Sequence, residues 1–227
     1  LNELNILHTT PKNQFDVPYE VFGGYAFSER QMAAFLPDAF SLYLQTEGEK
    51  QAAYPIEVLQ IRPLQKKFAA PMSHRDYLGA ILNLGIERCK IGDILAEPEE
   101  AYVFVKDTIA DYICDQLTRV RHTPVLAVRT ELSAFQYHPR FEVIRGSVAS
   151  VRLDTLLALA FSASRSKLTA LIEGGRVFVN GKLITSNGYQ IHEQDIISVR
   201  GLGRFRFLEV ASTTKKGRLY VTIEKYI

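Results

Sequence analysis

Residues 151–181, VRLDTLLALAFSASRSKLTALIEGGRVFVNG, contain the strongest signals for secondary structure in the C-terminal part of the chain. Leucines recur at helical spacing over 152–161, which predicts a helix with one apolar face. A short turn follows, and Ser164 is a typical N-cap for a second helix. Gly174-Gly175 ends that helix, because glycine adopts the left-handed conformation common after helix C-termini.

A small antiparallel sheet is predicted after the two helices. The apolar run 177–179 indicates a strand, and Asn180-Gly181 is a strong signal for a tight hairpin that returns through 182–184. Asp195 precedes another alternating segment. Further strands are predicted over 196–199, 205–210 and 219–223.

The middle of the chain has a different pattern. Alternating apolar residues predict strands, and apolar residues at helical spacing predict helices between them. The predicted order is strand 55–62, helix 74–84, strands 91–96 and 101–105, helix 106–120 and strand 125–128. This βαββαβ order is that of the ferredoxin-like fold, which hosts many unrelated functions.

The first 53 residues are read as a separate N-terminal α/β segment. Ser28 followed by Gln31 is a capping-box pattern that predicts a short helix over 29–36, ended by Pro37. Gly23-Gly24 fits a plain turn better than a backbone approach to a ligand. Residues 129–150 are read as a linker with strand character. The chain is thus predicted to be α+β, with domains over 1–53, 54–146 and 147–227.

Charge is distributed unevenly along the 227 residues. Residues 147–227 contain 12 Lys and Arg against 6 Asp and Glu, whereas residues 1–146 contain 15 against 19. A basic end on a mildly acidic body favours a polyanion as the partner of that end.

Several classes of protein are excluded by composition. The longest apolar-rich stretch, Leu153–Phe161, is far shorter than the roughly 20 residues of a membrane-spanning helix. Cys89 and Cys114 each stand alone, without a second Cys or a His at metal-ligand spacing. We therefore expect a cytoplasmic protein with no membrane contact, no metal and no cofactor.

The C-terminal residues resemble an S4-type RNA-binding domain. That pattern has an RLD start, SR at the head of a second helix, G-x-V-x-V-N-G and a later D-x-I. The matching residues here are Arg152-Leu153-Asp154, Ser164-Arg165, Gly175–Gly181 and Asp195-Ile196-Ile197.

Other motifs extend the resemblance to the YlmH family over nearly the whole chain. They are Gly23-Gly24-Tyr25, Glu29-Arg30, His74–Gly79, Ile91–Ile94, Gly201–Phe205 and Thr214–Arg218. The family has further helical sequence ahead of the position of Leu1. The resemblance implies association with the bacterial large ribosomal subunit, a role in stalled translation and a link to cell division. It makes ribosomal RNA, and also tRNA, the expected ligands.

In the S4-type fold, the polar side of the helix pair and the neighbouring hairpin face RNA. Helix N-termini and arginine side chains both suit phosphate. We therefore expect the two helix starts and the hairpin to form one basic surface. Its candidate RNA-binding residues are Arg152, Ser164, Arg165, Lys167, Arg176, Asn180 and Lys182. Ser164 is also expected to cap its helix, and Asp154 to be favoured there by the helix dipole.

A second basic cluster is predicted further along the chain. It consists of Arg204, Arg206, Lys215, Lys216 and Arg218. It either extends the RNA footprint or forms a solubilising hairpin, and the sequence leaves both open. In the middle domain, Tyr102 and Phe104 share one strand face, where core packing is favoured over base stacking. Arg75 and Arg88 are further candidate RNA contacts there.

Catalytic motifs were sought and rejected. His74-Arg75-Asp76 resembles a kinase catalytic loop, but the next asparagine is Asn83, too far along the chain. Arg152-Leu153-Asp154 resembles a pseudouridine synthase stretch, yet here it opens the binding domain itself. We predict a binding protein without enzymatic activity. The alternatives are an RNA-modifying enzyme using Asp76 or Asp93, and a partner of cell-division proteins.

Overall fold

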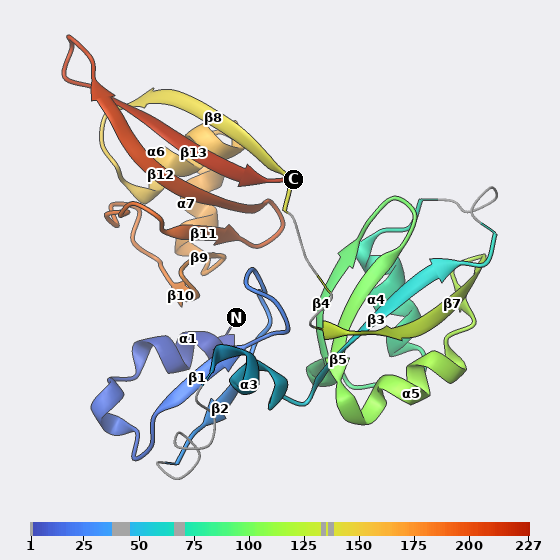
Figure 1. Ribbon diagram of the computed structural model, residues 1–227. Coiled ribbons are helices and arrows are strands. Elements are labelled where there is room, and N and C mark those ends of the chain that lie inside the picture. The colour runs from blue at the N-terminus through green and yellow to red at the C-terminus, as the bar shows by residue number, and fades with distance from the viewer. Residues whose placement is uncertain (1, 38–45, 66–70, 133–134, 136–138) are drawn as a thin grey trace. The chain divides into compact units, whose positions relative to one another are not determined.

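The computed structural model describes residues 2–37, 46–65, 71–132, 135 and 139–227 (Figure 1). The chain divides into two compact units. Residues Lys12–Tyr137 form the first, called here the middle unit, and Leu1–Pro11 with His138–Ile227 form the second, called the C-terminal unit. Among the described residues, no helix combines the length and the apolar character needed to cross a bilayer.

The middle unit contains a five-stranded antiparallel sheet. Its spatial order is β4-β5-β3-β7-β6. The strands are β3 (Ile56–Pro63), β4 (Ile91–Ala96), β5 (Ala101–Lys106), β6 (Arg119–Val120) and β7 (Thr123–Thr130). The helices α4 (His74–Leu82) and α5 (Asp107–Gln116) complete the unit, with a 3-10 turn at Arg88–Lys90 before β4. The predicted βαββαβ fold is confirmed, and β6 is a short addition to it.

One face of this sheet forms the core with the two helices. Leu59 and Ile61 of β3 and Val103 of β5 are fully buried against Tyr77 of α4 and Ile113 of α5. These strand residues alternate with residues on the opposite face, because successive side chains of a strand point to opposite sides. The alternation of apolar residues along these strands therefore determines which face of the sheet the helices cover.

A two-stranded sheet precedes this fold. It pairs β1 (Tyr19–Phe22) with β2 (Met32–Phe35), and α3 (Glu47–Ala52) and the 3-10 turn Lys12–Gln14 flank it. The helix predicted over 29–36 is therefore wrong. The backbone N–H groups of Glu29 and Arg30, in a bend before β2, donate to the Asp93 carboxylate at 2.7 and 3.0 Å, and residues 32–35 pair with β1 instead of forming a helix.

Gly24 is required by the packing of the protein itself. Its φ is +97°, and a Cβ atom there would overlap the ring of Phe104. The turn interpretation of Gly23-Gly24 is confirmed, and the close approach is to a side chain of the core.

The C-terminal unit is built on a six-stranded antiparallel sheet in the order β10-β9-β11-β12-β13-β8. Its strands are β8 (Phe141–Val148), β9 (Val177–Val179), β10 (Lys182–Leu183), β11 (Ile196–Val199), β12 (Gly203–Thr213) and β13 (Leu219–Tyr226). The helices α6 (Leu153–Phe161) and α7 (Arg165–Glu173) lie across one face of this sheet (Figure 1).

Residues 129–150, predicted as a linker with strand character, contain strand β8. This strand pairs with β13 along its whole length, from Phe141 opposite Tyr226 to Val148 opposite Leu219. Gly146 of β8 allows a close approach to α6, since a Cβ atom there would lie 2.5 Å from Leu159 Cδ1.

The core of this unit lies between helices and sheet. Leu153 and Leu156 of α6 are fully buried with Phe205 and Phe207 of β12 and Ile223 of β13. At about 1.5–3 kcal/mol for each large buried side chain, this layer stabilises the position of the helix pair. The helix α1 (Asn2–Thr9) packs at the sheet's edge, where Leu183 N–H of β10 donates to Asn5 Oδ1 at 2.7 Å.

Candidate nucleic-acid interface

The first turn of α7 presents two exposed cationic side chains, those of Arg165 and Lys167. Ser164 caps the helix by accepting a hydrogen bond from Lys167 N–H at 3.4 Å, as predicted. Among the described residues, neither cationic side chain has a hydrogen bond or an ion pair. The free backbone N–H groups of this turn and the two charges together offer a site for a phosphate group.

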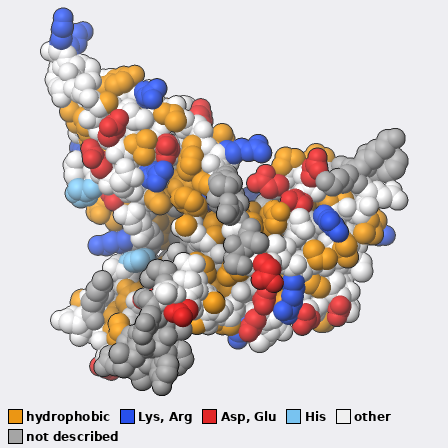
Figure 2. Space-filling model, viewed as in Figure 1, with side chains coloured by type: hydrophobic (Ala, Val, Ile, Leu, Met, Phe, Trp, Pro, Cys, Tyr) orange, Lys and Arg blue, Asp and Glu red, His pale blue; other side chains and the backbone are white. Residues whose placement is uncertain are grey.

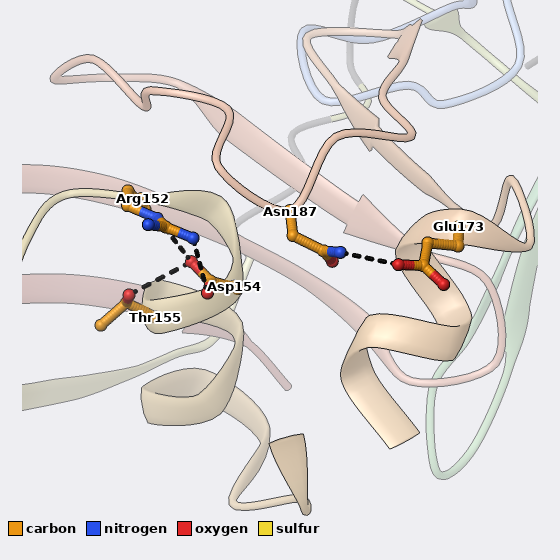
Figure 3. A network of polar contacts seen from close by, with 5 residues as sticks. All are labelled: Arg152, Asp154, Thr155, Glu173 and Asn187. Atoms are coloured by element: carbon orange, nitrogen blue, oxygen red, sulfur yellow. Dashed lines mark hydrogen bonds and ion pairs between the residues drawn. The ribbon is translucent and has the colours of Figure 1, made fainter. Parts of the chain in front are cut away.

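The start of α6 is different, because Arg152 is held by an acid. Its Nε and Nη2 atoms donate to Asp154 Oδ1 and Oδ2, both at 3.1 Å, and Thr155 donates to the same carboxylate at 3.3 Å. Figure 3 shows Arg152 turned toward Asp154. Asp154 therefore neutralises the predicted RNA-binding arginine, in addition to lying in the first turn of its helix.

The two helix starts do not meet. The Asn187 backbone carbonyl accepts a hydrogen bond from Asp154 N–H at 3.2 Å. The Asn187 side chain donates to Glu173 Oε1 at 2.9 Å (Figure 3). The beginning of α6 thus lies near the end of α7, about 12 Å along the helix axis from Arg165. The two helix starts are separated because the turn at Ser162 reverses the chain, and the single basic surface predicted for them stays a prediction.

The β9–β10 hairpin forms as predicted. Asn180 and Gly181 have φ values of 48° and 80°, the left-handed pair that a type I′ turn needs. The Asn180 side chain is engaged in the protein, since it donates to Asp195 Oδ1 at 2.7 Å and accepts from Ile196 N–H at 2.9 Å. Lys182 is exposed beside it.

Arg176 is exposed before β9, and sequence reasoning missed a second arginine beside it. Arg200 N–H donates to the Arg176 carbonyl at 2.9 Å, and the Arg200 guanidinium lies 5.1 Å from the centroid of the Phe178 ring. Its position directly after β11, which pairs with β9, was the available signal.

The second predicted basic cluster is divided. Arg206 pairs with Glu224 at 2.6 Å, and Arg204 lies 4.2 Å from the centroid of the Tyr226 ring. Lys215 and Lys216 are exposed at the tip of the β12–β13 hairpin, where Figure 2 shows basic side chains. Arg204 and Arg206 lie near the start of β12, which has 11 residues and spans about 35 Å, so they are far from the hairpin tip that follows its end.

Arg218 is not available to the second basic cluster, because its side chain is bound within the protein. Its guanidinium donates to the hydroxyl and the carbonyl of Ser147 on β8, at 3.0 and 2.6 Å. This arginine therefore ties the base of the hairpin to the neighbouring strand.

The strand aromatics of the middle unit pack inside the protein, as favoured. Phe104 is 1% exposed, with the Tyr25 ring stacked on it at 4.9 Å and the Phe135 ring edge-on at 5.2 Å. Phe135 also contacts Tyr102, at 5.0 Å. These rings close the sheet face on which RNA-recognition domains stack bases.

Asp93 and Asp76 both have structural partners. Asp93 accepts hydrogen bonds from the Tyr25 hydroxyl at 2.9 Å and from two backbone N–H groups. Asp76 accepts from the N–H and the hydroxyl of Ser73, both at 2.8 Å, which completes the capping box of α4. These hydrogen bonds lower the pKa of Asp76.

Of the two candidate arginines in the middle unit, one is engaged within the protein and the other is exposed. Arg88 donates to the Ile91 carbonyl at 2.5 Å and is half-buried, and burial lowers its pKa. Arg75 is exposed on the first turn of α4. Among the described residues, no group of three or more His, Cys, Asp and Glu side chains could hold a metal ion.

Two family models match the chain. One, described as "Putative RNA-binding domain in YlmH", matches residues 49–134, and the other, described as "S4 domain", matches residues 151–197. A solved structure, cell division protein ylmH from Streptococcus pneumoniae, is 26% identical. It covers 58% of this chain and 73% of that chain, with a TM-score of 0.41.

Two curated proteins are similar in sequence. An uncharacterized RNA pseudouridine synthase MG209 homolog from Mycoplasma pneumoniae is 48% identical over 48 residues, which are 21% of this chain and 16% of that protein. The ribosome-associated protein quality control protein P2 of Bacillus subtilis (strain 168) is 30% identical over 213 residues, 93% of this chain and 79% of that protein. A match of this extent, together with the two domain models, places this chain in the YlmH family of S4-domain proteins.

Proposed function

We propose that this protein docks on structured ribosomal RNA through the start of α7 and acts by binding, without catalysis. The observation that carries the proposal is the exposed first turn of α7, where Arg165 and Lys167 have no acidic partner among the described residues. Arginine and lysine beside free backbone N–H groups recognise phosphate, and duplex RNA is recognised mainly through its backbone and 2′-hydroxyls.

The relative from B. subtilis is named for ribosome-associated quality control, and the domain model over residues 49–134 is named for RNA binding. By this similarity we assign the protein a ribosome-associated role in the cytoplasm. Its proposed ligands are the RNA of the large subunit and the tRNA bound there, and its proposed role is to assist stalled translation.

The remaining predicted contacts are assigned by their surroundings. Arg176 and Lys182 are exposed, and Arg176 follows the C-terminal end of α7, so we propose them as contacts with the same RNA away from the first turn of α7. Arg152 and Asn180 reach RNA only by leaving protein partners, so we give them supporting roles. The exposed tip with Lys215 and Lys216 is proposed as a separate contact.

An RNA-modifying activity is disfavoured by the state of the two acids proposed for it. Asp93 uses both carboxylate oxygens in hydrogen bonds that hold the β1–β2 segment, and Asp76 caps a helix. A general base needs a free lone pair directed at its substrate. Comparison of RNA modifications in cells with and without the protein tests this alternative, which gains support if one modification disappears.

The test of the proposal is co-sedimentation with purified large ribosomal subunits at low salt. The Arg165→Gln, Lys167→Gln, Arg176→Gln triple variant is expected to stay at the top of the gradient, while wild type sediments with the subunits. A control triple, Arg62→Gln, Lys90→Gln, Lys106→Gln, removes the same charge from the middle unit. Co-sedimentation of both variants equal to wild type contradicts the proposal.

A further inference from the structure

The middle unit has a basic groove on its helical side. The groove has a volume of about 490 Å³ and lies between α4 and the segment that runs from the end of α5 into the β6–β7 turn. Three arginines line it: Arg75 on the first turn of α4, Arg119 on β6 and Arg121 in the turn. All three are exposed.

The charge of this groove contrasts with that of its surroundings. Residues 12–137 contain 13 Lys and Arg against 17 Asp and Glu. The one acid that lines the groove is Asp76, which is engaged by Ser73 and lies 3.7 Å from Arg121 Nε. Among the described residues, no carboxylate pairs with Arg75 or Arg119. The groove is therefore a local cationic site on an acidic unit.

The rest of the groove has a mixed lining, in which the apolar side chains are those of Ala80, Leu84 and Leu117. Gly79 also lines the groove, and a Cβ atom there would meet nothing within 4 Å. Asn83, Gln116 and Thr118 add two amides and a hydroxyl. Side chains that both donate and accept hydrogen bonds suit the 2′-hydroxyls of RNA, as arginines suit its phosphates.

Arg121 holds a backbone conformation that a side chain disfavours. Its φ is 54°, a region where glycine or asparagine is far commoner than arginine. The two-residue turn between β6 and β7 thus places a guanidinium at the groove where a less strained residue would serve the turn alone.

We propose that this groove, and not the open face of a base-stacking sheet, is the RNA contact of the middle unit. The sheet face is closed by the rings of Tyr25 and Phe135, so RNA stacking there would require the core to open. The arginines of the groove bind the phosphate backbone, and its amide and hydroxyl side chains form hydrogen bonds with ribose 2′-hydroxyls. This inference rests on the proposed RNA-binding function and adds a second surface to it.

The test measures binding of the full chain to deproteinised large-subunit ribosomal RNA at several salt concentrations. Removing three phosphate contacts by Arg75→Gln, Arg119→Gln and Arg121→Gln is expected to lower the slope of log K against log salt by about 2 to 3. The control triple at Arg62, Lys90 and Lys106 changes net charge equally. The proposal is overturned if the slope of log K against log salt falls equally in both variants, or if it falls by less than about 1 in the groove variant.

A second pair of variants leaves every arginine in place. Gly79→Glu puts a carboxylate into the open groove and is expected to weaken RNA binding, whereas Gly79→Gln, of the same size, retains most of it. Both variants keep the helical circular dichroism of wild type. Equal affinity of the two variants for RNA contradicts the electrostatic role of the groove.

The outcomes separate this inference from the proposed function. If only the variant at Arg165, Lys167 and Arg176 loses binding, the groove is not an RNA contact, although the proposed function stands. If only the groove variant loses binding, the inference holds and the site at α7 fails. A groove variant that keeps RNA binding but loses binding to poly-glutamate identifies an acidic protein as the partner and refutes the inference.

Discussion

Replacement of Asp93 by alanine tests whether this acid is a structural clamp. Its carboxylate accepts hydrogen bonds from the Tyr25 hydroxyl at 2.9 Å and from the N–H groups of Glu29 and Arg30 at 2.7 and 3.0 Å. The Glu29 donor is exposed and can return to water. The other two are partly buried, and at about 1.5 kcal/mol for each hydrogen bond to a charged group the loss is about 3 kcal/mol.

The assay is equilibrium urea unfolding of the full chain followed by circular dichroism. A loss of about 3 kcal/mol lowers the urea midpoint of the middle unit by roughly 1 to 2 M. Hydrogen exchange of β3 assigns the shifted transition to that unit. Asp115→Ala, at an exposed acid of α5, is the control and changes stability by less than about 0.5 kcal/mol. A loss below about 1 kcal/mol in Asp93→Ala refutes the reasoning, and unchanged stability with a lost RNA modification would instead support a catalytic role.

Three further predictions concern single positions. Asn180→Ala removes the 2.7 Å hydrogen bond to Asp195 and is expected to destabilise the C-terminal unit by about 1–3 kcal/mol in thermal unfolding. Gly146→Ala forces a methyl against Leu159 and costs about 1–3 kcal/mol, and Leu159→Ala in the same chain recovers part of the loss in urea unfolding. Burial, with a nearby arginine, lowers the pKa of His74 from 6.5, which NMR titration measures directly. The folded state disfavours the charged imidazole, so the stability contributed by neutral His74 is complete above pH 6.5 and is lost as the pH falls through the lowered pKa. A His74→Gln variant lacks this pH dependence of stability.

Local patterns in the sequence predicted most of the secondary structure correctly. The βαββαβ order, the helix pair at 153–161 and 165–173, and the hairpin at Asn180-Gly181 each depend on residues within a few positions of one another. Ser164 as a cap was predictable for the same reason. The Ser164-Arg165 pair of the S4-type pattern pointed to the start of α7 as a candidate RNA site, because Ser164 is a recognisable N-cap and the charged residues follow it directly.

Contacts between distant segments decided what local patterns misread. The segment 29–36 has a capping-box sequence, yet it contributes strand β2, which pairs with β1, and Asp93 binds the bend before it from 63 and 64 residues away. The strand character predicted within 129–150 became strand β8 through pairing with β13.

The two domain types and the basic character of the C-terminal end follow from the amino-acid sequence, since periodicity and charge are properties of neighbouring residues. Which of those charges are available to a ligand depends on how the chain folds. Arg152 and Asn180 are engaged by acids, whereas Arg165 and Lys167 are exposed, and Arg75 joins Arg119 across a groove. The physical reason is that an ion pair or a groove requires particular side chains to meet in space, and folding brings them together from positions that are separate along the chain.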